Sequence, residues 1–200
     1  GEFAEEFFTY TATDVSGLIS EISTITITIN GINDLPVTNN LSLETNEDVE
    51  IVGNIPEPID IDSDGINLNG YSLIENVSIG DLTFNNNGSF TFNPQNDFQY
   101  LLNGESTQVS FTYIYTDLSG GESNTSTVDI LITGNDDFPV TYNSSSSVDE
   151  DNSITQNVPE ATDDDLNGIN PDSYSLINDV NNGSLLFNND GSFSFDPLDE

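Results

Sequence analysis

An internal repeat of about 100 residues limits the possible folds of this sequence more than any other feature. When the sequence is shifted by 103 positions, residues 38–97 align with residues 141–200 without a gap, and 29 of these 60 positions are identical. A period of this length is too long for one coil of a solenoid. It is typical of a β-sandwich domain that is repeated along the chain. We therefore predict an all-β protein built from tandem sandwich repeats with a period of 103 residues.

The repeat divides the 200 residues into one complete unit and two partial units. Residues 1–36 correspond to the end of a preceding unit, residues 37–139 form the complete unit, and residues 140–200 correspond to the beginning of a following unit.

Two interpretations of these partial units stay open. The residues are either a piece of a longer array, which we favour, or a whole mature chain. In a whole chain, the last two strands, predicted at 7–14 and 23–30 within residues 1–36, are expected to dock onto the first five strands, supplied by residues 140–200 of another copy.

The apolar residues are spaced as in β-strands. Residues 111–115 and 128–132 are rich in aromatic and β-branched residues, and residues 25–29 alternate strictly between isoleucine and threonine. The sequence Asn-Asn-Asn-Gly at 85–88 favours a tight hairpin turn, because Asn and Gly tolerate a positive φ. We predict little helix. The strands expected in the complete unit lie near 38–45, 49–55, 71–76, 80–86, 89–93, 108–116 and 124–133.

Composition excludes several classes of function. The chain has no Lys, Arg, His or Cys but 36 Asp and Glu residues, which gives a net charge of −36. Phosphate binding requires basic residues, so we expect no nucleic-acid partner, and no apolar segment approaches the roughly 20 residues needed to enter a membrane. The usual general bases and nucleophiles are absent. We therefore expect no enzyme activity and no catalytic residue; hydrolysis by two carboxylates is the one chemical alternative.

Several short motifs mark the complete unit: residues 80–83 (Gly-Asp-Leu-Thr), 87–94 (Asn-Gly-Ser-Phe-Thr-Phe-Asn-Pro), 111–117 (Phe-Thr-Tyr-Ile-Tyr-Thr-Asp) and 120–121 (Gly-Gly). Asn-Asp-Asp-Phe-Pro-Val closes the unit at 135–140. Together these motifs resemble the VCBS and bacterial cadherin-like repeats of large bacterial surface adhesins. The resemblance covers essentially the whole chain. It implies immunoglobulin-like or cadherin-like sandwiches in long extracellular arrays at the cell surface, with calcium at the domain junctions.

The acidic residues include two candidate calcium loops. Residues 60–65 read Asp-Ile-Asp-Ser-Asp-Gly and residues 163–168 read Asp-Asp-Asp-Leu-Asn-Gly, and both fit the opening of a calcium-binding loop. Alternate carboxylates in such a loop turn toward one centre, and glycine allows the sharp bend. An EF-hand would have glutamate at the twelfth position, where these loops have Tyr71 and Tyr174. They are therefore not EF-hands, and the remaining ligands must come from other segments; a solvated acidic turn is the simpler alternative.

Topology suggests where those ligands lie. In a Greek-key sandwich, the loop between the second and third strands is at the same end as the loop between the last two. The acidic loop at 60–64 is therefore expected near Asp117 and near the linker at 33–34. The opposite end carries Glu47 and Asp48, close to the linker at 136–137. The predicted metal ligands are Asp14, Asn33, Asp34, Glu47, Asp48, Asp60, Asp62, Asp64, Asp117, Asp136, Asp137, Glu150, Asp151, Asp163, Asp165 and Asn167.

Electrostatics gives a reason for a cation that is independent of the resemblance. Two carboxylates about 4 Å apart repel by roughly 4 kcal/mol at an effective dielectric constant near 20. A divalent cation converts this repulsion into attraction, and ligands that are all oxygen favour calcium over zinc or copper. We expect a structural repeat of an extracellular bacterial surface fibre or adhesin, which calcium stiffens and whose partners are neighbouring repeats or other copies of the chain. The alternative is a carbohydrate- or protein-binding adhesin module, which would have an exposed aromatic pair beside a calcium site.

Overall fold

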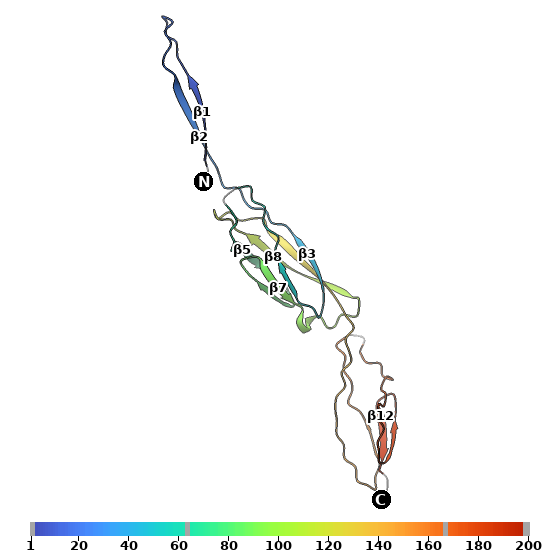
Figure 1. The fold of residues 1–200 in the computed structure, drawn as a ribbon. Helices are drawn as coiled ribbons and strands as arrows, with labels where there is room; N and C mark the ends of the chain where they lie inside the picture. Colours follow the sequence, from blue (N-terminus) through green and yellow to red (C-terminus); the bar gives the residue numbers. More distant parts are fainter. Residues whose placement is uncertain (1–2, 63–64, 166–167, 198–200) are drawn as a thin grey trace.

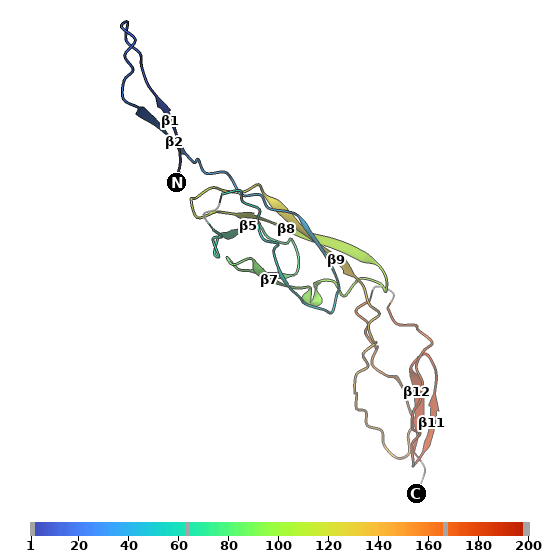
Figure 2. The same cartoon turned by 45° about the horizontal axis from the view of Figure 1, so that its top comes forward.

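The protein has three bodies that follow one another along an extended molecule (Figure 1). The computed structural model describes residues 3–62, 65–165 and 168–197. A β-hairpin comes first, a complete β-sandwich lies in the middle, and a smaller three-stranded body lies at the C-terminal end. A second view shows the same order, with the hairpin and the C-terminal body at opposite ends (Figure 2).

The central body is a sandwich of two sheets. One sheet has the strand order β3-β9-β8-β5, in which β3 runs parallel to β9 and the other pairs are antiparallel; the second has the antiparallel order β4-β7-β6. The strands agree with the seven predicted from alternation. Their bounds are β3 Leu41–Asn46, β4 Ile51–Asn54, β5 Tyr71–Glu75, β6 Asp81–Phe84, β7 Ser89–Asn93, β8 Ser106–Tyr115 and β9 Ser126–Thr133. The helix content is low, as predicted, with a single short 3-10 helix η1, Gln95–Asp97, in the described part of the chain.

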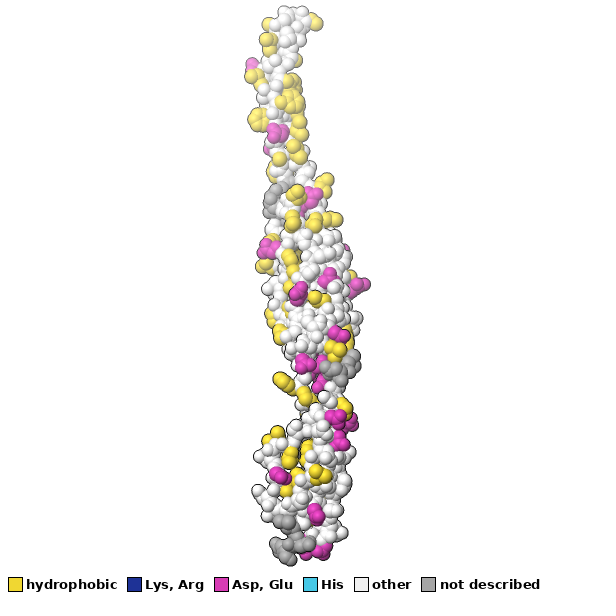
Figure 3. All heavy atoms as spheres, turned by 90° about the vertical axis from the view of Figure 1, so that its right-hand side faces the viewer, with side chains coloured by type: hydrophobic (Ala, Val, Ile, Leu, Met, Phe, Trp, Pro, Cys, Tyr) yellow, Lys and Arg dark blue, Asp and Glu magenta, His cyan; other side chains and the backbone are white. Residues whose placement is uncertain are grey.

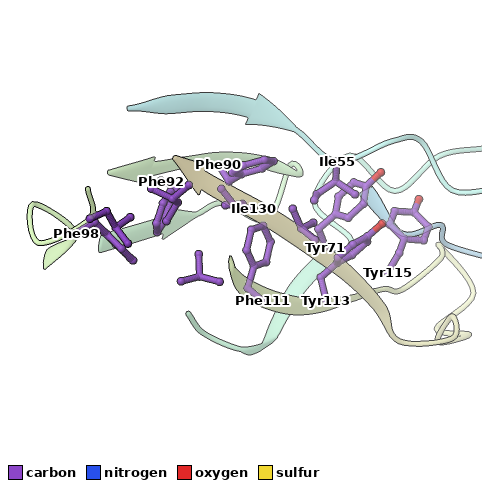
Figure 4. Packing of buried hydrophobic residues seen from close by; sticks show 13 residues of the cluster. Ile55, Tyr71, Phe90, Phe92, Phe98, Phe111, Tyr113, Tyr115 and Ile130 are labelled. Carbon is purple, nitrogen blue, oxygen red and sulfur yellow. The ribbon is translucent and has the colours of Figure 1, made fainter. Parts of the chain in front are cut away.

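The hydrophobic core lies between these two sheets (Figure 4). Strand β9 alternates between buried and half-buried residues along its whole length, so that Val128, Ile130 and Ile132 all point inward. Aromatic residues supply much of the rest. The ring of Phe111 on β8 packs edge-on against Phe90 on β7, with ring centroids 5.3 Å apart. Such pairs add to the stabilisation that burial of apolar surface already provides.

The N-terminal body is an isolated hairpin of two antiparallel strands, β1 Phe3–Tyr10 and β2 Ser23–Asn30. The sequence predicted strand from Phe7 to Asp14; the observed strand starts and ends four residues earlier. Every residue of both strands is exposed, including the isoleucines of β2. A two-stranded hairpin without a covering layer has little stability of its own.

The C-terminal body contains three strands in the order β10-β12-β11. Their bounds are β10 Ile154–Asn157, β11 Ser184–Phe187 and β12 Ser192–Asp196. The expectation of five strands from residues 140–200 is therefore wrong for two of them. Residues 144–149 and 174–178, the counterparts of β3 and β5, are not strands. In the central body β3 pairs with β9 and β5 pairs with β8, and the described residues of the C-terminal body include no counterpart of β8 or β9.

The strands of the outer bodies lie at a constant distance in sequence from their central counterparts. β1 and β2 begin 103 residues before β8 and β9, since 106 − 3 and 126 − 23 are both 103. β10, β11 and β12 begin 103 residues after β4, β6 and β7. Two isolated bridges, Val37 with Ile59 and Val140 with Thr162, are related in the same way. Across the described residues, no helix has the length and apolar character needed to cross a membrane.

Candidate metal site

Acidic side chains gather where the central body meets the C-terminal body, here called the second junction (Figure 3). Glu47 follows β3 directly, and the ladder hydrogen bond from its backbone N–H to the carbonyl of Thr133, 3.1 Å, fixes its position. Its Oε1 atom accepts a hydrogen bond of 2.7 Å from the backbone N–H of Asn135. The Glu47 side chain is only 1% exposed. A carboxylate is therefore buried at the exit of the central sandwich.

The linker brings a second set of carboxylates to the same junction. The backbone N–H of Asp137 donates a hydrogen bond of 2.9 Å to Oδ2 of Asp165, and the N–H of Asp165 donates one of 3.0 Å to Oδ1 of Asp163. Asp165 belongs to the C-terminal body and is 4% exposed. The side-chain amide of Asn135 donates to Oδ2 of Asp48 at 3.2 Å. Both bodies and the linker between them thus contribute acidic groups.

Three carboxylate oxygens at the second junction are buried and have no hydrogen-bond partner. They are Oε2 of Glu47, Oδ2 of Asp137 and Oδ1 of Asp165. Buried polar atoms in proteins nearly always have a partner, and leaving a charged one without a partner is costly. One oxygen of Glu47 and one of Asp165 is already held by a backbone N–H. The second oxygen of each of these side chains is left for another ligand.

The electrostatics of the junction also favour a cation. Burial raises the pKa of Glu47 above its usual value, a hydrogen bond from the backbone of Asn135 opposes this change, and the negative charges of Asp137, Asp48 and Asp165 raise the pKa further. The pKa of Asp137 is also raised, first by burial and then by Asp48 and Asp165. The like charges are thus close enough to disfavour one another's ionisation. No positive side chain is available, because the chain has no Lys, Arg or His.

The first junction, between the hairpin and the central body, has the same backbone arrangement. The N–H of Asp34 donates a hydrogen bond of 2.6 Å to Oδ2 of Asp62, and the N–H of Asp62 donates one of 3.1 Å to Oδ1 of Asp60. These bonds repeat those of Asp137 and Asp165, 103 residues further along. The two predicted acidic loops therefore dock onto their linkers in the same way.

Asp117 distinguishes the first junction. This side chain is buried, and its Oδ1 accepts a hydrogen bond of 2.7 Å from the backbone N–H of Gly121. Its Oδ2 accepts one of 2.9 Å from the side-chain amide of Asn33. The Asn33 bond is the main cause of a lowered pKa for Asp117. A neutral donor thus stabilises the charged form of Asp117 at the first junction, whereas the second junction has an acid, Asp136, at the position of Asn33.

The structure leaves several predicted ligands apart from these groups. Asp136 is exposed in the linker, and Glu150 and Asp151 are exposed in a turn of the C-terminal body. Asp14 is exposed at the tip of the hairpin, where its Oδ1 accepts hydrogen bonds from the backbone of Ser16 and Leu18 at 2.8 and 2.9 Å. Two other predicted ligands, Asp64 and Asn167, lie outside the described residues.

The arrangement fits a cation but does not contain a finished binding site. Among the residues that the structure describes, no group of three or more acidic side chains already forms a metal-binding arrangement. Mutual repulsion of unneutralised carboxylates opposes their close approach. The partnerless oxygens of Glu47, Asp137 and Asp165 are hard ligands of the kind that calcium prefers. These three residues, with Asp48 and Asp163 beside them, fit a calcium ion better than any other cofactor.

Sequence reasoning missed the neutral residues that position these acids. Asn135 holds both Glu47 and Asp48, and the Gln99 side chain donates to the other oxygen of Asp48 at 3.2 Å. Gly121 is also required, because a Cβ atom there would lie 2.5 Å from Oδ2 of Asp117 and 2.7 Å from Nδ2 of Asn33. The Asn at the start of 135–140 was visible in the sequence as part of the linker motif. No motif in the sequence indicated that Gln99 would contact Asp48.

Comparison with known proteins gives a family and a group of structures. The family model of the bacterial cadherin-like domain matches residues 33–134, which cover the central sandwich and the linker before it. A search of curated proteins gave no match. Among solved structures, the chain is similar to the extracellular domain of protocadherin GammaB4, with 17% identity and a TM-score of 0.49, and to protocadherin Gamma C5 EC1-3, with 15% identity and a TM-score of 0.44.

These structural matches extend along nearly the whole chain. The alignments cover 98% of this chain in both cases, with 31% of the protocadherin GammaB4 chain and 67% of the protocadherin Gamma C5 chain. The chain therefore spans about a third of the length of the first of these structures.

Proposed function

Because this chain belongs to the family of bacterial cadherin-like domains, we propose that it is a structural part of an extracellular bacterial surface fibre or adhesin. In this proposal the 103-residue units are beads of a longer array, and calcium at each junction holds neighbouring beads in line. The partners are neighbouring repeats of the same kind. No catalytic role is proposed, since the chain has no His, Lys or Cys to serve as base or nucleophile.

One observation carries the calcium proposal: three carboxylate oxygens at the second junction are buried and have no hydrogen-bond partner. They come from three different segments. Glu47 belongs to the central body, Asp137 to the linker and Asp165 to the C-terminal body. A ligand that binds all three ties the two bodies together through the linker. A ligand within one body would not have this effect.

Calcium, when bound, supplies two positive charges and accepts six to eight oxygen ligands at about 2.3–2.6 Å. The protein's own residues supply the oxygens and hold them in place. The N–H groups of Asn135 and Asp137 orient Glu47 and Asp165 by binding one oxygen of each carboxylate. Asp48 is oriented by Gln99 and Asn135. At the first junction, Asp34, Asp60 and Asp62 are the counterparts of Asp137, Asp163 and Asp165, and Asp117 is an additional carboxylate.

The linkers are suited to such stiffening. Each is only a few residues long, and Pro36 and Pro139, two residues after Asp34 and Asp137, restrict the backbone. Val37 and Val140 then form backbone bridges to Ile59 and Thr162 of the following body. Little free chain remains between the anchoring points. Charge repulsion between the facing carboxylates is thus the main force that a cation has to overcome.

Thermal unfolding with and without calcium tests the proposal. A ligand at 100 times its dissociation constant stabilises the folded state by about 2.7 kcal/mol per independent site. For a domain of this size, this corresponds to an increase in melting temperature of about 10–20 °C. The apo protein is prepared with EDTA and dialysed, and calcium is added back in steps, with magnesium as a control for non-specific screening. An unchanged melting curve after chelation would falsify the proposal.

A binding module is the second candidate, because one aromatic side chain is exposed beside the candidate site. Phe138 directly follows Asp137 and is 93% exposed. Aromatic rings at such positions can stack on a sugar or insert into a protein partner. Screening the calcium-loaded protein against a glycan array, with Phe138→Ala as the control, separates this role from a purely structural one. A binding role requires a glycan signal that the substitution removes.

A further inference from the structure

We propose that strands β3 and β9 form a mechanical clamp, which carries tension through the central body from one linker to the next. This is a further function of the sandwich and is separate from calcium binding. It rests on the proposed array only for the source of the tension, because each bead of a fibre is pulled by its two neighbours. The clamp itself is a property of the complete central body and of its hydrogen bonds.

Tension enters and leaves the central body through two strands that are direct neighbours. The first linker leads into β3, and β9 leads into the second linker. The two linkers lie at opposite ends of the central body (Figures 1 and 2). Because β3 is hydrogen-bonded to β9, a direct load path crosses only this strand pair. Strands β4 to β8 lie outside that path.

The parallel direction of β3 and β9 determines how their hydrogen bonds are loaded. Both strands begin at the end of the body that faces the hairpin, and both end at the second junction. A pull on the first linker therefore draws β3 toward the hairpin, while a pull on the second linker draws β9 the other way. The strands are forced to slide past each other, so the evenly spaced bonds of the parallel ladder share the load. Strands that are pulled apart from one end would instead lose their bonds one after another.

The contact between the two strands extends beyond the ladder at both ends. The ladder itself pairs residues 41–46 with residues 128–133. Before it, the backbone N–H of Thr127 donates a hydrogen bond of 2.9 Å to Oδ1 of Asn40. After it, the backbone N–H of Glu47 donates one of 3.1 Å to the last carbonyl of β9. The bonds of the ladder therefore have further bonds on both sides that are loaded in the same direction.

A buried threonine reinforces the clamp at the point where tension enters. Thr38 lies shortly before β3 and is 4% exposed. Its backbone N–H donates to Oδ1 of Asn124 at 3.0 Å, and its carbonyl accepts from the Asn124 side-chain amide at 3.1 Å. Its hydroxyl donates to the backbone carbonyl of Asn124 at 2.9 Å and lies 2.8 Å from the hydroxyl of Ser126. The backbone and the side chain of Thr38 are thus both bound to the start of β9.

The residue after Thr38 is held as well. The hydroxyl of Tyr113, a core residue of β8, donates a hydrogen bond of 2.6 Å to the backbone carbonyl of Asn39. With the bond between Asn40 and Thr127, three successive residues are tied to β8, to β9 or to the loop between them. Polar networks whose members are all satisfied make a structure rigid. A load on the first linker reaches this network before it reaches the ladder.

Glu47 closes the clamp at the end where tension leaves. Its Oε1 atom accepts the hydrogen bond of 2.7 Å from the backbone N–H of Asn135, the first residue after Gly134 in the second linker. A pull on that linker therefore loads this bond together with the ladder. All the bonds of the clamp join protein groups to one another, so we expect the clamp to act both with and without calcium.

Pulling the same chain in two directions tests the proposal. The chain has no cysteine, so a cysteine added at each terminus provides unique attachment points for end-to-end tension. In the second geometry, Thr125→Cys replaces the C-terminal attachment point, at an exposed position directly before β9. This geometry pulls β3 and β9 apart from the end at which both begin, so that their bonds open in sequence. The residues of the clamp are unchanged in both chains.

At the same constant force, the central body is expected to survive end-to-end tension for about 10-fold longer or more, because forced unfolding follows the unfolding rate rather than the equilibrium stability. The event is recognised by its length, since roughly 90–100 residues are released at about 3.5 Å each. Both measurements are made in EDTA, so that the outcome does not depend on the calcium proposal. Equal lifetimes in the two directions would overturn the clamp. A direction dependence that calcium leaves unchanged would support the clamp and count against the calcium site.

Matched substitutions test the role of Thr38. Thr38→Val removes the hydroxyl that binds Asn124 and Ser126, and it is expected to shorten the lifetime under end-to-end tension by about 10-fold. Thr45→Val is the control, because the Thr45 hydroxyl donates to the carbonyl of Val49 at 2.7 Å, within the turn after β3. The control is expected to change the lifetime by less than about 2-fold, since its lost bond does not join β3 to β9.

A core variant outside the load path separates mechanical from thermal stability. Leu82→Ala on β6 removes a side chain that packs against the core. It is expected to lower the melting temperature more than Thr38→Val does, because it leaves a cavity, and yet to shorten the lifetime under tension less. This reversal of order would support the clamp. Lifetimes that instead follow the melting temperatures across the wild type and the three variants would overturn it.

Discussion

The backbone N–H of Asn135 donates a hydrogen bond of 2.7 Å to Oε1 of Glu47, and this bond joins the linker to the end of the central sandwich. It fixes one oxygen of a carboxylate that is almost fully buried and leaves Oε2 without a partner. Glu47 can therefore respond to a cation without rearrangement of the strand before it. The following predictions use this geometry and its relation to the rest of the chain.

Glu47→Gln is expected to abolish most of the stabilisation by calcium at the second junction. In the calcium-free protein, the same change should leave stability unchanged or increase it slightly, because it removes one of several facing negative charges. The matched control is Glu44→Gln, an identical chemical change three residues earlier on β3 at an exposed position. Melting temperatures of the three proteins, with and without calcium, check this. Equal calcium responses in both variants would exclude Glu47 as a ligand.

Calcium is expected to lengthen and stiffen the molecule in solution. The second junction is held by hydrogen bonds from Asn135 and Asp137 to carboxylates of the two bodies, and without a cation the repulsion between these carboxylates opposes them. Small-angle scattering should therefore give an extended rod in calcium and a smaller maximum dimension after chelation. Equal maximum dimensions in both conditions would contradict the stiffening role.

Two equivalent phenylalanines should respond very differently to truncation. Phe111→Ala removes a ring that packs against Phe90 and Phe84 in the core, so it is expected to destabilise the central body by about 3–5 kcal/mol. Phe8→Ala, at the counterpart position in the exposed hairpin, should change the stability of the monomer by no more than about 0.5 kcal/mol.

Chemical denaturation at low protein concentration measures both values. A large loss of stability from Phe8→Ala in the dilute monomer would mean that the hairpin is already packed within its own chain.

Much of the fold could be predicted from the sequence because the pattern is local. Strict alternation over residues 25–29 and the β-branched run at 128–132 predicted strands, and Asn-Gly at the turn after β6 predicted the hairpin to β7. The 103-residue self-similarity predicted which segments correspond, and the observed strands keep that offset. The clustering of acids near the linkers followed from Greek-key topology. The burial of Glu47 could not be predicted in full. Alternation places Glu47 in phase with Leu41 and Leu43 and Glu44 out of phase, but it does not show that a carboxylate at the end of the strand becomes almost fully buried.

One tetrapeptide that occurs twice shows that local sequence alone does not determine secondary structure. Tyr-Ser-Leu-Ile at 71–74 lies within strand β5, whereas the same four residues at 174–177 are not a strand. The sequence determined the alternation and the strand propensity, which are equal in the two copies. Tertiary structure decided the outcome, because a strand needs a neighbour to satisfy its backbone hydrogen bonds and to cover its apolar face. Strand β8 provides that neighbour for β5, and within this chain its counterpart β1 lies at the far end of the molecule.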